Sequence, residues 1–481
     1  MGDYYLTRFI FQRALALIYL IGFLIIINQF KPLLGEKGLL PVPQFIKYIP
    51  FFNSPSIFYL FPKDKAFMIF GVIGFLLSIF ALSSFSERFG LGISMVTWFF
   101  LWAIYLSFVN VGQVFYSFGW ESMLLEAGFL SIFLGDMQTK VPITIIFLLR
   151  FILFKDMFGS GLIKLRGDEC WRDLTCLKFH YETQPIPNPL SWFFHWLPLW
   201  NHKSDVVFNH VIEIIAPFTY FFSQLYSFIG GGLTMFFQGL LMISGNFSFL
   251  NLLTIVLCIP TFSDTYLSKI IALKIPPNLN DPYIYSQTVL VTVIILGIMN
   301  IRPIINMISP NQIMNTSYDP LHLVGSYGAF GTVTKERYEI IIEGTDSNII
   351  SQNSVWKEYD FFGKPGKVDV APIQIAPYHL RLDWLMWFAA FSKTANDPWF
   401  VHLMQKLLLG DKDLLSLLKS NPFPNSAPKY IRALYYKYNF TTPEEKSKNN
   451  NWWKRDLIGE YFPAVSLNDA RFKSILNNFG W

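Results

Sequence analysis

The sequence has little charge. Asp, Glu, Lys and Arg make up 15% of its 481 residues, whereas an ordinary soluble domain carries about 25%. The net charge of +5 is small for this length, and no basic stripe interleaved with aromatic residues is present, which argues against a nucleic-acid partner. Apolar residues replace the missing charge, since 52% of the chain is hydrophobic and 18% is aromatic. This composition predicts contact with membrane lipid.

Signatures of catalysis and of metal binding are also missing. The chain has no G-x-S-x-G nucleophile pattern, and the G-x-G spacing at 159–161 follows no strand, which argues against a phosphate-binding loop. The histidines lack the i, i+4 spacing of a helical metal pair, and a zinc site completed by Glu182 is a minor alternative. The histidines concerned are His180, His195, His202 and His210. We expect no catalytic set, no cofactor and no metal site.

Cysteine is scarce, with three residues in the whole chain. Cys258 lies in an apolar run and is expected to be an inert core thiol. Cys170 and Cys176 lie in a polar stretch, and a turn between them would allow a disulfide if their Cα atoms come within about 7 Å. Such a bond would persist only in an oxidising compartment. Two free thiols are the alternative.

Long apolar runs are abundant. A bilayer-spanning helix needs about 20 mostly apolar residues, and about seven to nine helices are expected. The segments are 9–30, 66–85, 91–116, 141–154, 206–225, 228–244, 250–261 and 283–307. The expected fold is therefore a polytopic α-helical membrane bundle over residues 1–309. A polar loop at about 158–204 interrupts it.

The hydrophobic pattern of the sequence changes after residue 310. Tyr338, Ile340 and Ile342 alternate with Glu339, Ile341 and Glu343, which predicts a strand. Further strands are predicted within 354–369, 429–440 and 451–463, and short helices within 380–391, 398–410 and 411–420. Residues 310–481 are expected to form a C-terminal soluble α+β domain. About 170 residues are enough to bury a core.

Four charged residues in apolar surroundings form a candidate intramembrane polar cluster. Such groups are costly in a membrane and usually face a partner inside the bundle. The cluster comprises Glu121, Glu126, Lys164 and Arg166, with Arg150 and Lys155 as further candidate partners. The two glutamates point about 140° apart on a helix and form no obvious acid/base dyad. A site for a polar ligand or proton is one interpretation, and buried ion pairs that fix helix packing are the favoured one.

Three N-x-Ser/Thr sequons bear on the compartment. Asn246 lies in an apolar run, whereas Asn315 and Asn439 lie in the polar tail and are the candidate glycosylation sites. Glycans there would place the tail in the lumen of the endoplasmic reticulum. Arg8 and Arg13 leave a mitochondrial inner-membrane location as an alternative.

Several long blocks resemble the lipase maturation factor family. They are "FGWESMLLEAGFL", "MFGSGLIKLRGDECWRDLTCLKFHYETQPIPNPLSWFFHWLP", "QGLLMISGNFSFLN", "VAPIQIAPYHLRLDWLMWFAAF", "NPFPNSAPKYIRALYYKYNFT" and "WWKRDLIGEYFP". The resemblance implies a multi-pass protein of the endoplasmic-reticulum membrane that assists folding and dimer assembly of secreted lipases as a chaperone, without an assigned reaction. The helix pattern is also distantly similar to vitamin K-dependent carboxylases.

Three functions follow as hypotheses. The first is a non-catalytic folding factor, a glycoprotein that contacts membrane lipid and a client lipase through the polar stretch and the tail. In that stretch Pro185, Pro187 and Pro189 favour extended backbone, because each fixes φ and biases the residue before it. The second is a membrane enzyme with Glu121, Glu126 and Lys164 around an intramembrane pocket. The third is a structural subunit of a larger membrane assembly.

Overall fold

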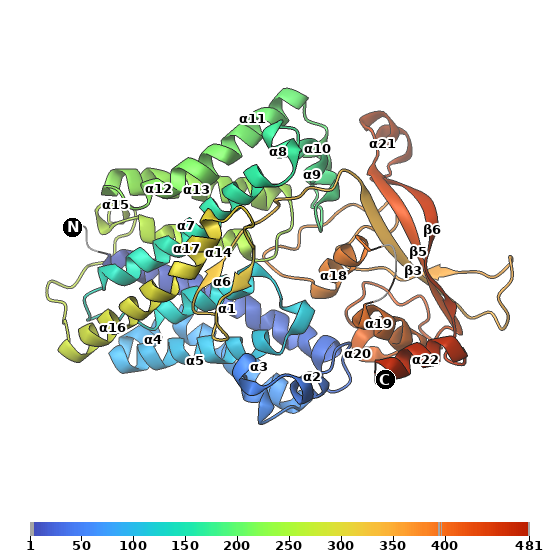
Figure 1. Cartoon of the computed structure of the whole chain (residues 1–481), viewed down its shortest axis with the longest axis horizontal. Helices are drawn as coiled ribbons and strands as arrows, with labels where there is room; N and C mark the ends of the chain where they lie inside the picture. Colours follow the sequence, from blue (N-terminus) through green and yellow to red (C-terminus); the bar gives the residue numbers. More distant parts are fainter. Residues whose placement is uncertain (1–3, 393–394, 396, 480–481) are drawn as a thin grey trace.

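The computed structural model describes residues 4–392, 395 and 397–479. Figure 1 shows a body of long helices at one side of the molecule and a sheet with short helices, formed by the C-terminal part of the chain, at the other. The expected fold class, a helical membrane bundle followed by an α+β region, is confirmed.

Five described helical segments are long and apolar enough to cross a membrane. They are α1 (Tyr5–Leu34), α3 (Asp64–Leu82), α5 (Leu91–Asn110), α13 (Gln224–Ser244) and the joined pair α16 (Tyr283–Met299) and α17 (Ile301–Ile308). Twenty helical residues rise about 30 Å, which matches the hydrocarbon core of a bilayer. The most apolar windows of α1 and α5 are 56% and 61% buried, against 22% for α16–α17, which therefore lies at the outside of the bundle.

The other apolar segments form helices of a different kind. α7 (Ile143–Arg166) is long but carries several buried charges, and α14 (Leu250–Cys258) is short. Residues 206–219 belong to one continuous run made of α11 (Leu199–His210), the π-helical segment η4 (Val211–Ile215) and α12 (Ala216–Thr219). Pro217 follows η4 closely, and proline has no N–H to donate to the preceding turn, which favours a local change of helix geometry.

Short elements connect the long helices. α6 (Gly119–Ser131) is the most enclosed of them, with twelve of its residues buried inside the bundle. The others are α2 (Val42–Tyr48), η1 (Phe51–Asn53), η2 (Ile57–Tyr59), α4 (Phe85–Arg88), η3 (Gln113–Phe115), η5 (Ile259–Thr261) and α15 (Asp264–Leu267).

Residues 166–196, which we call the polar segment, fold into three short helices. These are α8 (Glu169–Arg172), α9 (Leu177–Thr183) and α10 (Ser191–His195). The three prolines lie in the non-helical stretch between α9 and α10, where proline-rich sequence favours extended backbone. Residues 181–188 are all buried. This part of the polar segment is therefore covered by other parts of the chain rather than open to water.

Residues 310–481, which we call the tail, contain a four-stranded antiparallel sheet in the order β4-β3-β5-β6. Its strands are β3 (Arg337–Thr345), β4 (Lys357–Glu358), β5 (Tyr430–Phe440) and β6 (Trp453–Val465). Ile340 pairs with Tyr435 in the centre of the sheet. The strands expected from the sequence are thus present, although the one within 354–369 is only two residues long.

The alternating residues along β3 do not divide into a buried face and a solvent-exposed face. Residues 339–345 are all buried. Ile340 and Ile342 belong to the core cluster that contains residues of α18 (Arg381–Ala389) and α19 (Pro398–Leu408), whereas Ile341 packs in a cluster with Trp192 of the polar segment. Glu339 is buried with its charge, and its carboxylate pairs with Arg337 at 2.5 Å and with Lys364 at 3.0 Å. A polar residue on a predicted strand is therefore in the core here, where an ion pair compensates its burial.

The predicted tail helices are present as α18 (Arg381–Ala389), α19 (Pro398–Leu408) and α20 (Lys412–Leu415), and α21 (Pro443–Asn449) and α22 (Ala470–Asn478) follow later. Pro398 occupies the first turn of α19, as expected. Gly410 beyond its end has φ +62°, a left-handed conformation that favours glycine. The end of α1 contacts the tail, since Lys31 pairs with Asp413 at 2.7 Å and Gln29 donates to the carbonyl of His379 at 2.6 Å.

Candidate functional site

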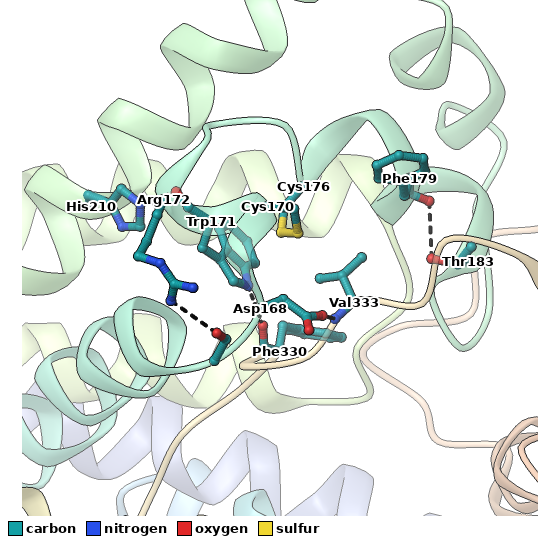
Figure 2. The surroundings of a disulfide bond; sticks show 11 residues. Asp168, Cys170, Trp171, Arg172, Cys176, Phe179, Thr183, His210, Phe330 and Val333 are labelled. Carbon is teal, nitrogen blue, oxygen red and sulfur yellow. Dashed lines mark hydrogen bonds between the residues drawn. A yellow bond between two sulfur atoms is a disulfide. The ribbon is translucent and has the colours of Figure 1, made fainter. Parts of the chain in front are cut away.

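The polar segment contains a disulfide. Cys170 in α8 and Cys176 before α9 are bonded, with their Cα atoms 4.7 Å apart and a sequence separation of 6. Both cysteines are buried. Figure 2 shows the bond at the base of the short turn that joins the two helices. Cys258 is a buried free thiol in α14.

Contacts around the disulfide hold the loop against residues 330–333, in the first part of the tail. The indole of Trp171 donates to the carbonyl of Phe330 at 2.8 Å, and the backbone N–H of Val333 donates to Asp168 at 2.6 Å (Figure 2). Arg172 donates to the backbone carbonyls of residues 165 and 167. The arrangement is that of a structural staple.

Hydrogen bonds also join the polar segment to the tail sheet. Arg337 on β3 is completely buried and donates to the backbone carbonyls of Glu182, Gln184 and Pro185 at 3.0, 2.5 and 3.0 Å. Trp192 in α10 donates to the carbonyl of Thr441 at 2.8 Å, just beyond the end of β5. The polar segment and the tail therefore pack directly together, which requires both to lie on one side of a bilayer.

The two glutamates of α6 are paired, but with different partners. Glu121 pairs with Arg381 of the tail helix α18 at 2.8 Å and accepts from the hydroxyl of Tyr105 at 2.5 Å. Glu126 pairs with Lys155 of α7 at 2.5 Å and accepts from the hydroxyl of Tyr327. The first pair joins α6 to the tail, and the second joins α6 to α7, the next helix along the chain.

Lys164 and Arg166, the other two members of the candidate cluster, belong to further networks. Lys164 pairs with Glu213 of the π-helical segment at 2.5 Å and donates to Asn209 at 3.0 Å. Arg166 donates to Gln312 at 2.7 Å and to the carbonyl of residue 307 at 2.9 Å. The four residues therefore do not form one cluster but contribute to separate networks along the bundle.

The two candidate glycosylation sites differ in accessibility. Asn315 is exposed and lies near the start of the tail. Asn439 is half-buried in β5, and its side-chain nitrogen, the atom that would carry a glycan, donates to Glu182 at 3.4 Å. Only Asn315 is open to modification in this structure.

Histidines of the polar segment do not converge on a common point. Within the described residues no group of three or more His, Cys, Asp or Glu side chains has a geometry that could hold a metal ion. Burial lowers the pKa of His180 to about 3 and that of His195 to about 4, so both rings are neutral near pH 7. Their roles are packing ones, as the stacking of His180 on Phe247 illustrates.

Two surfaces of the tail are suited to contact other molecules. A cavity of about 520 Å³ lies between α6, residues 327–332 of the tail and α18, and Trp120, Trp384 and Phe388 form part of its wall. We call it the aromatic cavity. The second surface is the free edge of β6, which is the outer strand of the sheet. Leu457 and Ile458 on this strand are 58% and 56% exposed.

Comparison with known proteins assigns the family. The model of the lipase maturation factor transmembrane domain matches residues 6–269, and the model of the lipase maturation factor C-terminal domain matches residues 323–463. The chain belongs to the lipase maturation factor family. It is a membrane protein with several apolar helices.

Members of the lipase maturation factor family align with almost the whole chain. Lipase maturation factor 1 of Mus musculus is 41% identical over 98% of this chain and 89% of its own length, and the Homo sapiens protein is 40% identical with the same coverage. Lipase maturation factor 2 of Xenopus laevis is 30% identical over 100% of this chain and 85% of its own length. No solved structure matches.

Sequence reasoning missed several polar residues of this lipase maturation factor family member. Lys155 was among the partners considered for the glutamates, but Arg381, the partner of Glu121, lies 260 positions away. Arg337 and Glu213 carried no signal in a single sequence, because only the fold shows that each is buried against a partner. Arg150, another partner considered, donates to backbone carbonyls and to a tyrosine hydroxyl instead.

Proposed function

We propose that this chain is a folding factor of the endoplasmic-reticulum membrane that assists maturation and dimer assembly of a secreted lipase. It acts by binding the client and not through a reaction of its own. The proposal is supported by its family, whose named members are lipase maturation factors, and by the free edge of β6. We retain the division into a membrane domain, 1–309, and a soluble tail, 310–481, as part of this proposal.

The lumen of the endoplasmic reticulum suits the chemistry of the polar segment. Disulfides persist in oxidising compartments, and the Cys170–Cys176 bond lies in the part of the chain that packs against the tail. The exposed sequon at Asn315 is consistent with the same compartment. Since the polar segment and the tail are joined, we assign both to the lumenal face.

The free edge of β6 is the feature best suited to hold an incompletely folded client. An outer strand presents unpaired backbone N–H and C=O groups, which an extended segment of another chain can pair with. Lys454, Asp456, Leu457 and Ile458 are exposed along this strand. Ile458 is the extra residue of a β-bulge, since Leu457 pairs with Tyr436 and Gly459 pairs with Tyr435, and a bulge locally disrupts the ladder and bends the strand.

Secretion of active lipase tests the proposal. In cells that lack their own maturation factor, this chain should restore secreted lipase activity per mass of lipase. A variant with Leu457→Lys and Ile458→Lys should lose most of this restoration at an unchanged expression level, because two charges oppose apolar pairing at the edge. Val355→Lys, an exposed apolar residue outside the strands, is the matched control and should behave as the wild type. Failure of the unmodified chain to raise lipase activity would contradict the proposed function.

A further inference from the structure

A small polar chamber lies inside the bundle beside the polar segment. Its volume is about 60 Å³, and its walls come from α7, α9, α11, η4, α13 and α14. The paired side chains of Lys164 and Glu213 form one wall, with Asn209 next to them. Asp156 forms another part of the wall and accepts from the hydroxyl of Thr254 at 2.9 Å.

Three polar atoms in the wall of this polar chamber have no hydrogen-bond partner among the residues that the structure describes. They are the side-chain nitrogens of Asn209 and Asn251 and one carboxylate oxygen of Glu213. All three residues are more than nine-tenths buried, with exposed fractions of 6%, 3% and 4%. Buried polar groups in native proteins nearly always have a hydrogen-bond partner. Two donors and one acceptor in one chamber therefore indicate a ligand that both accepts and donates.

Two unusual backbone features, a π-helical segment and a close approach of two helices at a glycine, lie beside the polar chamber. Glu213 lies within the π-helical segment η4, and π-bulges occur frequently at functional sites. Gly161 of α7 faces it closely, since a Cβ at 161 would approach the Cβ of Glu213 to 3.1 Å and a side-chain carbon of Ile214 to 2.7 Å. A larger residue at 161 would push η4 away from α7.

The polar chamber adjoins the aromatic cavity. Asp156, Phe247, Leu250, Ala329 and Phe330 line both spaces. The aromatic cavity, at about 520 Å³, falls within the range of about 300–1,000 Å³ that is usual for ligand pockets. Together the two spaces have a polar inner end and an apolar outer part.

We propose that the polar chamber and the aromatic cavity together bind an uncharged single-chain amphiphile, whose hydroxyl-bearing head enters the chamber and whose apolar chain lies in the cavity. A hydroxyl group accepts from the free nitrogens of Asn209 and Asn251 and donates to the free oxygen of Glu213. The charges of Lys164 and Glu213 neutralise each other, and Asp156 adds an acid, so an anionic head is disfavoured.

Photolabelling of the purified full chain in detergent tests this site, independently of any lipase. The probe is a monoacylglycerol with a diazirine in its acyl chain, and mass spectrometry maps the labelled residues. We expect saturable labelling of the aromatic cavity, competed by unlabelled monoacylglycerol and at least tenfold less well by a fatty acid or lysophosphatidylcholine of equal chain length. Labelling that does not saturate, or that maps elsewhere, would overturn the proposal, and equal competition by the fatty acid would overturn the choice of an uncharged head.

Variants connect the binding to the polar chamber. Asn251→Leu removes one free donor with little change of volume and should weaken binding about fivefold, the usual worth of one hydrogen bond. Trp102→Phe is the control, because it removes a buried unpartnered N–H in α5 outside the chamber. Ala329→Phe, at a half-buried residue between the two spaces, should block labelling without removing a polar group. If Asn251→Leu and Ala329→Phe, both folded by gel filtration, bind as tightly as the control, the chamber is not the site.

Discussion

Replacing Arg337 by alanine tests how firmly the polar segment is held against the tail. The side chain is fully buried and is the donor to three backbone carbonyls of residues 182–185 as well as to Glu339. Alanine would leave the three carbonyls unpaired and Glu339 with Lys364 as its remaining cationic partner. Removing one member of a buried pair costs about 3–5 kcal/mol.

Local opening should therefore become easier in Arg337→Ala by about 4 kcal/mol. Because each 1.36 kcal/mol is a factor of ten, amide hydrogen exchange in residues 182–192 should accelerate by about three orders of magnitude, unless another opening limits it. The exchange rates of Arg337→Lys should lie between those of the wild type and of Arg337→Ala. An ammonium keeps the charge but lacks the planar guanidinium that reaches several carbonyls.

A matched control is available on the neighbouring strand. Arg432 on β5 pairs with Glu343 at 2.8 Å, but its side chain is 28% exposed. Partly exposed ion pairs contribute about 0–1 kcal/mol, so Arg432→Ala should change the same exchange rates by less than about fivefold. If residues 182–192 exchange their amide hydrogens at the same rates in Arg337→Ala and in Arg432→Ala, the buried arginine does not hold the polar segment in place.

Three further predictions address the staple, the pH response and modification. Changing Cys170 and Cys176 to serine should lower stability by about 2 kcal/mol, the loop-closure value for so short a loop, seen as a lower midpoint of thermal unfolding. Burial raises the pKa of Asp383 to about 6 from 3.8, so the folded state holds a proton more tightly than the unfolded one. Tail stability should then fall by about 3 kcal/mol between pH 4 and 6 and stay level above, and Asp383→Asn should flatten this profile. Asn315→Gln should abolish a glycan-dependent shift in gel mobility, whereas Asn439→Gln should not, because the amide nitrogen of Asn439 is already bonded within the protein.

The membrane helices and the tail strands could be predicted because their signals are local. A run of about 20 apolar residues has few structural alternatives, and β5 is rich in tyrosine, a residue type that favours strands. The burial of residues 339–345 on both faces of β3 could not be predicted, since it depends on the polar segment packing near one of those faces. Glu339 was therefore expected on a polar face and is found in the core.

Partners of the buried charges were predicted only where they were near in sequence. Lys155 follows Glu126 by one helix and was a candidate, whereas Arg381 comes from the tail and required the tertiary fold. The polar chamber depends on the same kind of long-range contact, because Glu213 and Asn251 meet only after α7, η4 and α14 have packed. A single sequence contains the residue types of such a site but not their convergence.

Membrane topology is the most direct test that the polar segment and the tail form one unit on the lumenal face. Lys178→Cys and Lys454→Cys place exposed single thiols in the two parts, against a background in which the natural cysteines are bonded or buried. In sealed microsomes, a membrane-impermeant maleimide should label neither thiol until detergent opens the membrane, and should then label both. Labelling of one position, but not the other, in sealed microsomes would contradict the account.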